Sequence, residues 1–117
     1  MCNSFFAVKL SFLNEIYDIA KYFGIDYKDL KNMFLSDYRI GNSHTEVPGL
    51  DGERGYGGKC FPKDIKSFIS WGKENNIDLE MCKAADKVNE RVRKNKDWFN
   101  IKGAISNNNY KIKGEYK

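Results

Sequence analysis

The chain of 117 residues is long enough for one domain, and its 41% hydrophobic and 31% charged residues are typical of a protein that folds in water. A net charge of +4 suits a partner that carries phosphates, but no recognisable nucleic-acid motif accompanies it, so a solvated lysine face is favoured over a nucleic-acid site. The three cysteines show no paired spacing, which argues against a disulfide framework. The sequence has no basic leader and no apolar run of membrane-spanning length, which argues against a signal peptide and a membrane protein. We therefore expect the protein in a reducing cytoplasm.

The first predicted element is a helix over residues 4–23. Its apolar side chains recur at three- and four-residue steps, at Phe5, Phe6, Leu13, Ile16, Ile19, Ala20 and Phe23. Val8, Leu10 and Tyr17 add apolar surface on other faces, so we expect this helix to be buried on more than one side. Gly24 follows the last apolar residue and is predicted to end the helix.

A second, shorter helix is predicted over residues 27–35, with Asp26 as its N-cap. The stretch that follows, residues 37–59, is irregular and holds six of the ten glycines. A loop of this length inside a small domain is usually functional or disordered.

Two more helices are predicted, over residues 62–74 and 78–96. Pro62 fits the first turn of the earlier one, where its missing N–H costs little. The buried side of that helix is expected at Ile65, Phe68, Ile69 and Trp71. The later helix has an apolar face at Met81, Ala84, Ala85, Val88 and Val92, with Cys82 on its core side.

Residues 98–117 carry a weak signal that fits either a short hairpin or a frayed tail. The sequence therefore predicts an all-α fold, in which a long helix and about three further helices surround one glycine-rich loop. The predicted organisation is a helical domain over residues 1–97 followed by a tail over residues 98–117.

The end of the long loop, GYGGKCFPKD over residues 55–64, is the most informative segment. Gly55, Gly57 and Gly58 allow a ligand to approach the backbone closely, and their N–H groups can bind an anion or sugar hydroxyls. Cys60 is predicted just ahead of a helix N-terminus, whose positive end favours the thiolate over the thiol and suits a nucleophile.

Asp64 would lie one turn from the sulfur of Cys60, where it can orient water or take part in proton transfer. Both residues also have a purely structural interpretation. Lone cysteines are most often small buried hydrophobes, and an aspartate in a first helical turn usually interacts only with the helix dipole. Position alone leaves the two interpretations open.

The decamer over residues 55–64 resembles the active-site signature of the UDP-glucose/GDP-mannose dehydrogenase family. Two other stretches agree with the family in order and spacing. The run from Asn3 to Glu15 resembles the family's long central helix, and Arg39-Ile40-Gly41 resembles a step between that helix and the cysteine loop. The segment from Ser43 to Gly49 resembles the form of this loop found in one branch of the family. The likeness covers residues 3–93.

The resemblance implies a central domain with a fold like that of the C-terminal domain of 6-phosphogluconate dehydrogenase. It also implies a two-step oxidation of the C6 hydroxyl of a nucleotide sugar, with NAD as the cofactor. It implies that Cys60 is the nucleophile that forms a thiohemiacetal and then a thioester. Asp64 and Asn3 match the other active-site residues of the family. The residues expected to contact the substrate are Arg39, Gly55, Tyr56, Gly57 and Gly58.

The resemblance also implies a homodimer through the helix over residues 4–23, with Arg39 reaching the substrate of the partner subunit. His44 either contacts the substrate or faces solvent from the loop, and the solvent-facing position is favoured.

The family's catalytic lysine would fall before Met1, and no G-x-G-x-x-G follows a strand, so the NAD-binding fingerprint is missing. We therefore expect no dehydrogenase activity from this chain alone. Two alternatives follow. The chain is either the cysteine-bearing module of an enzyme whose NAD-binding part is encoded separately, or a non-catalytic dimerisation module or remnant.

Overall fold

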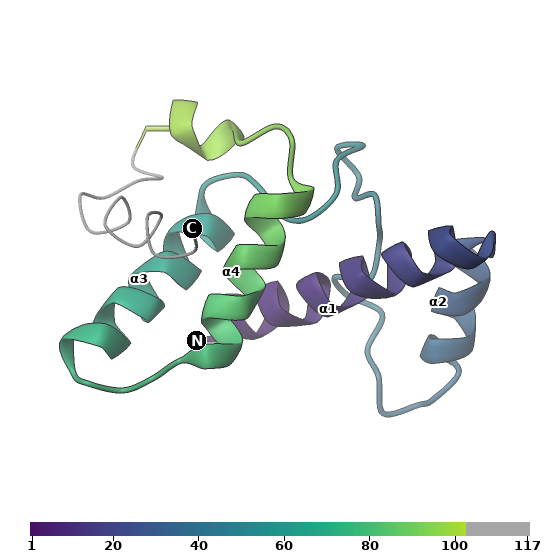
Figure 1. The fold of residues 1–117 in the computed structure, drawn as a ribbon, viewed down its shortest axis with the longest axis horizontal. Coiled ribbons are helices and arrows are strands. Elements are labelled where there is room, and N and C mark those ends of the chain that lie inside the picture. The colour runs from purple at the N-terminus through teal and green to yellow at the C-terminus, as the bar shows by residue number, and fades with distance from the viewer. Residues whose placement is uncertain (103–117) are drawn as a thin grey trace.

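Helix α1 (Cys2–Phe23) is the element against which the other helices pack. In Figure 1, α3 (Cys60–Glu74) and α4 (Glu80–Val92) lie beside its N-terminal half, and α2 (Tyr27–Leu35) lies near its C-terminal end. The computed structural model describes residues 1–102, and in that range the chain forms helices and no strand. The predicted all-α fold class is confirmed.

The end of α1 and the start of α2 follow local sequence signals. Gly24 ends α1 in the left-handed conformation, with φ of 66°, as its lack of a side chain allows. Asp26 caps α2 by accepting a hydrogen bond of 3.0 Å from the backbone N–H of Lys28. The predicted C-cap and N-cap are therefore confirmed.

Helix α1 has one buried and one exposed apolar face. Ala7, Leu13 and Ala20 are almost fully buried in the core. Phe5, Phe12 and Ile19, each seven residues from the next, are 64%, 51% and 49% exposed. The expectation that α1 is buried on more than one side agrees with its contacts with α2, α3 and α4, while the stripe of Phe5, Phe12 and Ile19 stays exposed.

Helix α3 begins at Cys60, two residues before the predicted start. Ile65 and Ile69 are buried as expected, but Trp71 is half exposed, so its predicted place in the core is wrong. Lys66 is buried instead, because its ammonium group lies 2.7 Å from the carboxylate of Asp86 on α4.

Helix α4 is shorter than the predicted helix over residues 78–96, and its buried face is rotated. It ends at Val92, because Arg93 takes an extended conformation and turns its side chain inward. Ala85, Asp86 and Asn89 face the core, while Met81 and Ala84 are exposed. The predicted apolar face was wrong by part of a turn. Asp86 and Asn89 face inward because they bond to Lys66 and to the backbone of Tyr56.

The long loop contributes to the core. Val47, next to Pro48 across a cis peptide bond, and Tyr56 are buried with apolar residues of α1, α3 and α4. The loop is therefore tied to the helices over much of its length rather than standing clear of them.

After α4 the chain turns into the 3-10 helix η1 (Asp97–Asn100), in which Trp98 is only 2% exposed. The predicted boundary between residues 97 and 98 falls inside this helix. The hairpin or frayed tail predicted from residue 98 lies, from residue 103 on, outside the described residues. None of the helices in residues 1–102 is long and apolar enough to cross a membrane.

Candidate active site

Cys60 is the first residue of α3, and its side chain is exposed. It therefore lies within the helix N-terminus rather than just ahead of it, as the sequence had indicated. The first N–H groups of a helix have no partner within the helix, and they make this end of α3 electropositive. Lys59 at the N-cap position makes no side-chain cap. A thiolate at Cys60 would meet both the helix end and solvent.

Asn3 and Asp64 lie together beside Cys60. The side-chain N–H of Asn3 donates a hydrogen bond of 2.7 Å to a carboxylate oxygen of Asp64, across 61 positions of sequence. Asp64 is four residues after Cys60 and so lies on the same side of α3. The other carboxylate oxygen of Asp64 is 3.5 Å from the ammonium nitrogen of Lys63. Three of the predicted site residues are thus gathered where α1 meets the start of α3.

Asn89 of α4 holds the glycine-rich loop from behind. Its side-chain oxygen accepts from the backbone N–H of Tyr56 at 2.8 Å, and its side-chain nitrogen donates to the carbonyl of Tyr56 at 3.0 Å. A side chain at Gly55 would collide with the same oxygen of Asn89. The loop can approach α4 this closely only because residue 55 is glycine.

Asp97 and Arg93 hold the next part of the loop. The backbone N–H of Gly58 donates to the carboxylate of Asp97 at 2.9 Å. The buried guanidinium of Arg93 lies 2.8 Å from Asp51 and 3.6 Å from Asp97, and it fills the space that a side chain at Gly57 would need. The N–H of Gly58, expected to meet a ligand, is therefore used within the chain.

The sequence analysis did not identify Asn89, Arg93 or Asp97 as part of this region. A signal for two of them was present, because Asn89 and Arg93 interrupt what would otherwise be the inward side of the predicted helix over residues 78–96. Buried polar groups need partners, and the nearest candidates are the polar backbone groups of a glycine-rich loop.

The side chain of Tyr56 lies in the hydrophobic core, where its ring meets Phe61 edge to face with ring centres 6.1 Å apart. Its predicted contact with a sugar is not apparent from this position.

Arg39 lies away from Cys60, in the segment after α2. Its side chain is 74% exposed and forms an ion pair of 2.6 Å with Asp37. The side-chain hydrogen bonds from Arg39, and then the bond from its backbone N–H, lower the pKa of Asp37 below its ordinary value; the side-chain bonds also raise the pKa of Arg39. In the part of the chain that the structure describes, Arg39 is not brought to Asn3, Cys60 or Asp64.

His44 is stacked between two aromatic rings rather than facing solvent as the sequence analysis favoured. Its ring centre lies 4.2 Å from that of Phe6 on α1 and 5.2 Å from that of Phe61 on α3, with interplanar angles of 17° and 23°. Burial, and then the charge of Lys9, lower the pKa of His44 below its ordinary value. The imidazole is therefore favoured in its neutral form.

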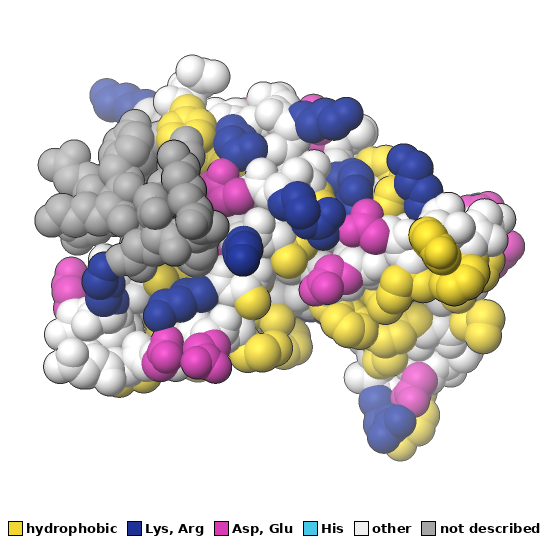
Figure 2. All heavy atoms as spheres, in the orientation of Figure 1, with side chains coloured by type: hydrophobic (Ala, Val, Ile, Leu, Met, Phe, Trp, Pro, Cys, Tyr) yellow, Lys and Arg dark blue, Asp and Glu magenta, His cyan; other side chains and the backbone are white. Residues whose placement is uncertain are grey.

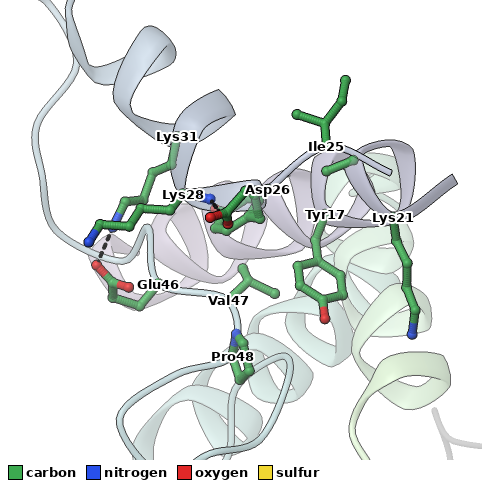
Figure 3. A pocket seen from close by; sticks show the side chains of 11 residues that line it. Tyr17, Lys21, Ile25, Asp26, Lys28, Lys31, Glu46, Val47 and Pro48 are labelled. Atoms are coloured by element: carbon green, nitrogen blue, oxygen red, sulfur yellow. Dashed lines mark hydrogen bonds and ion pairs between the residues drawn. The ribbon is translucent and has the colours of Figure 1, made fainter. Parts of the chain in front are cut away.

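A pocket of about 630 Å³ lies elsewhere, between the C-terminal part of α1, the start of α2 and the loop around Pro48. Figure 3 shows Lys28, Lys31 and Glu46 at one side of it and Tyr17 at the other, with the ion pair between Lys31 and Glu46 marked. None of the predicted site residues lines it. The chemistry of Cys60, Asp64 and Asn3, rather than the volume of a hollow, identifies the candidate site.

No group of ligands in residues 1–102 could hold a metal ion. Residues 1–102 form helices and no strand, so they lack the strand–helix–strand unit that binds a dinucleotide and do not fit NAD.

Comparison with known proteins covers most of the chain. A model of the UDP-glucose/GDP-mannose dehydrogenase family, central domain, matches residues 1–91. A UDP-glucose 6-dehydrogenase of Pseudomonas aeruginosa is 35% identical over 91 residues, which are 78% of this chain and 19% of that relative. A Rickettsia bellii UDP-glucose 6-dehydrogenase is 38% identical over 88 residues, covering 75% of this chain and 19% of the relative. The chain thus spans about a fifth of the length of the curated relatives it matches.

Proposed function

The chain belongs to the UDP-glucose/GDP-mannose dehydrogenase family, and we propose that it carries the cysteine nucleophile of a nucleotide-sugar 6-dehydrogenase. The hydrogen bond between Asn3 and Asp64, one helical turn from Cys60, is the observation that best supports this proposal. It gathers a thiol, a carboxylate and an amide from two helices at an exposed helix N-terminus.

The proposed reaction oxidises the C6 hydroxyl of a nucleotide sugar twice and ends in a carboxylate. Both oxidations need a hydride acceptor, and NAD held by a separate part of the enzyme would supply it. After the first oxidation, the sulfur of Cys60 bonds to the aldehyde carbon and the carbonyl oxygen becomes an alkoxide. Loss of the second hydride leaves a thioester. Water then attacks the thioester carbon, the C–S bond breaks, the sulfur takes up a proton from the attacking water, and the carboxylic acid and the free thiol are released.

Asn3 and Asp64 have complementary roles in this proposal. Asp64 accepts the bond from Asn3 through one oxygen and is left with lone pairs that can orient the attacking water. The remaining N–H of the Asn3 amide can donate to the developing oxyanion. UDP-glucose is the expected substrate, because the similar proteins carry the name UDP-glucose 6-dehydrogenase.

We propose in addition that the chain forms a homodimer through α1. The exposed stripe of Phe5, Phe12 and Ile19 supports this, because an apolar face of this size is rarely left in water. Figure 2 shows hydrophobic side chains gathered over the region where Figure 1 places the later part of α1 and α2. In such a dimer the exposed guanidinium of Arg39 would be available to the substrate of the partner subunit.

The all-helical residues 1–102 do not supply a dinucleotide site, so dehydrogenase activity is proposed only together with a separate NAD-binding part. A cytoplasmic location is proposed because Cys2, Cys60 and Cys82 are all free thiols.

A chimera tests the function. Residues 1–91 replace the matching segment of the Pseudomonas aeruginosa UDP-glucose 6-dehydrogenase, and NADH formation from UDP-glucose and NAD is followed by absorbance. We expect activity in the chimera, a loss on the order of a thousandfold or more in its Cys60→Ala variant, and little change in Cys82→Ala.

Full activity in a folded Cys60→Ala chimera would show that Cys60 is not the nucleophile. A folded, dimeric chimera without activity would instead favour the second candidate function, a dimerisation module without catalysis, which the exposed apolar stripe of α1 also supports.

A further inference from the structure

His44 connects the two helices that carry the candidate site. Its ring lies between Phe6, three residues after Asn3 on α1, and Phe61, the residue directly after Cys60 on α3. We call Phe6, His44 and Phe61 the aromatic clamp. The clamp and the hydrogen bond from Asn3 to Asp64 are thus two separate connections between the same helix ends.

The backbone just ahead of His44 is also held against α1. The ammonium group of Lys9, on α1, donates hydrogen bonds of 2.7 Å to the carbonyls of Gly41 and Ser43, just ahead of His44. His44 itself has φ of 59°, a conformation uncommon for residues with a side chain but several-fold enriched for histidine and asparagine. The loop therefore presents the ring to the gap between α1 and α3 in a defined orientation.

The contribution of His44 is its flat ring rather than a hydrogen bond. Its Nδ1 atom is buried and has no hydrogen-bond partner among the described residues. The lowered pKa agrees with this, because a neutral ring between two apolar rings tolerates an unpaired nitrogen better than a charged ring would. Stacked aromatic pairs stabilise an arrangement beyond the area that they bury.

We propose that His44 is a positioning residue, which sets the first turn of α3, and with it Cys60, against the Asn3 end of α1. The proposal rests on the proposed function in so far as Cys60 is the nucleophile. The geometry that it describes exists without turnover, so it can be tested in the full chain even if that chain has no activity.

The test uses nuclear magnetic resonance on the full 117-residue chain, in which His44 is the only histidine and its ring signals need no further assignment. In the wild type we expect nuclear Overhauser effects from the His44 ring to the rings of both Phe6 and Phe61. Missing effects to either ring would overturn the clamp.

Two variants then separate the ring from the backbone. His44→Asn keeps a residue that tolerates positive φ but removes the ring, and His44→Phe keeps a ring. In His44→Asn we expect exchange of the Asn3 side-chain amide with water to rise about threefold to tenfold, the factor that corresponds to one aromatic pair. In His44→Phe we expect a smaller rise.

The side-chain amide of Asn75 is the internal control, because it bonds to a carbonyl at the far end of α3. It should not change. Equal exchange of the Asn3 amide in wild type and His44→Asn, or equal rises in the two variants, would overturn the proposal. A merely structural role would lower the free energy of unfolding without moving the Asn3 amide in the native state.

Should His44→Asn fail to fold, Phe61→Leu removes the clamp from the other side. The same local rise at Asn3 is expected, with Phe23→Leu, an exposed position at the end of α1, as the matched control. No rise in folded Phe61→Leu would also overturn the proposal.

Discussion

Gly55 and Gly58, which lie on either side of Tyr56 and Gly57 in the chain, are glycines for different reasons. Both have positive φ, of 70° and 78°. A side chain at Gly58 would meet no atom within 4 Å, whereas one at Gly55 would collide with Asn89. Backbone conformation alone constrains Gly58, while Gly55 also has to let α4 approach.

Alanine at the two positions should therefore have unequal effects. We expect Gly58→Ala to lower the free energy of unfolding by about 1–2 kcal/mol, the cost of a left-handed alanine. Gly55→Ala should cost about 3 kcal/mol, because it also displaces the side chain of Asn89 and breaks the two hydrogen bonds that Asn89 makes with the Tyr56 backbone. Urea unfolding followed by circular dichroism measures both. Equal losses would show that the contact with Asn89 is unimportant.

Tyr27 gives the protein a predictable response to alkaline pH. Burial, and then the charge of Glu46, raise the pKa of Tyr27 to about 12. Its hydroxyl donates a 2.7 Å hydrogen bond to the carbonyl of Thr45. Because the folded pKa is above the unfolded one, the stabilisation is complete below about pH 10 and is lost as the pH rises toward 12.

We expect Tyr27→Phe to remove this part of the pH dependence. Between about pH 9 and pH 11.5 the wild type should lose roughly 1–3 kcal/mol more than the variant does. The measurement is urea unfolding at each pH. Tyr22→Phe, at a highly exposed position, is the control and should follow the wild type. Parallel curves for wild type and Tyr27→Phe would contradict the prediction.

At the scale of elements, α1 has one apolar face in the core and a second apolar face exposed to solvent. Ala7, Leu13 and Ala20 face the core, while Phe5 and Phe12 belong to the exposed stripe. The stripe also borders a shallow groove between α1 and α4, in which Phe12 and Met81 take part. A helix with two apolar faces is expected to bury the second one against another molecule.

A charge on the exposed stripe should weaken self-association. We expect Phe12→Lys to raise the dimer dissociation constant by at least about tenfold, since a central aromatic anchor contributes more than 1.4 kcal/mol to a typical interface. Light scattering over a concentration series measures this constant. Asn32→Lys adds the same charge at an exposed position on α2 and should leave the constant unchanged. A monomeric wild type at high concentration would contradict the dimer itself.

At the scale of the whole molecule, the segment after α4 closes the domain. Arg93 and Asp97 hold the glycine-rich loop, and Trp98 is buried directly after them. The cysteine loop is therefore supported from α4 and η1 as well as from α1. The support extends past residue 91, where the match to the family ends.

The two tryptophans of the chain form a matched pair for testing this closure. Trp98 is 2% exposed and Trp71 is 50% exposed. We expect Trp98→Ala to lower the free energy of unfolding by about 3–5 kcal/mol, as for a large side chain removed from a core. Trp71→Ala should cost about 1 kcal/mol, since mainly its stacking on Phe68 is lost. Similar losses in urea unfolding would show that η1 is not part of the folded unit.

The helices could be predicted because their signals are local. The apolar period of α1, the cap at Asp26 and the end at Gly24 each depend on residues within a few positions of one another. The spacing of Cys60 and Asp64 on one side of α3 is local in the same sense. The end of α4 was predicted wrongly, because its real end depends on the distant partners of Arg93.

The sequence by itself determined the all-α class, the approximate positions of the helices and the place of Cys60 at the start of α3, since short-range periodicity and spacing carry that information. Only the tertiary structure decided that Asn3 bonds to Asp64, that Asn89 clamps the loop and that His44 is stacked beside Cys60. These contacts join residues that are between 17 and 61 positions apart. Which polar groups meet at such separations depends on how the helices pack.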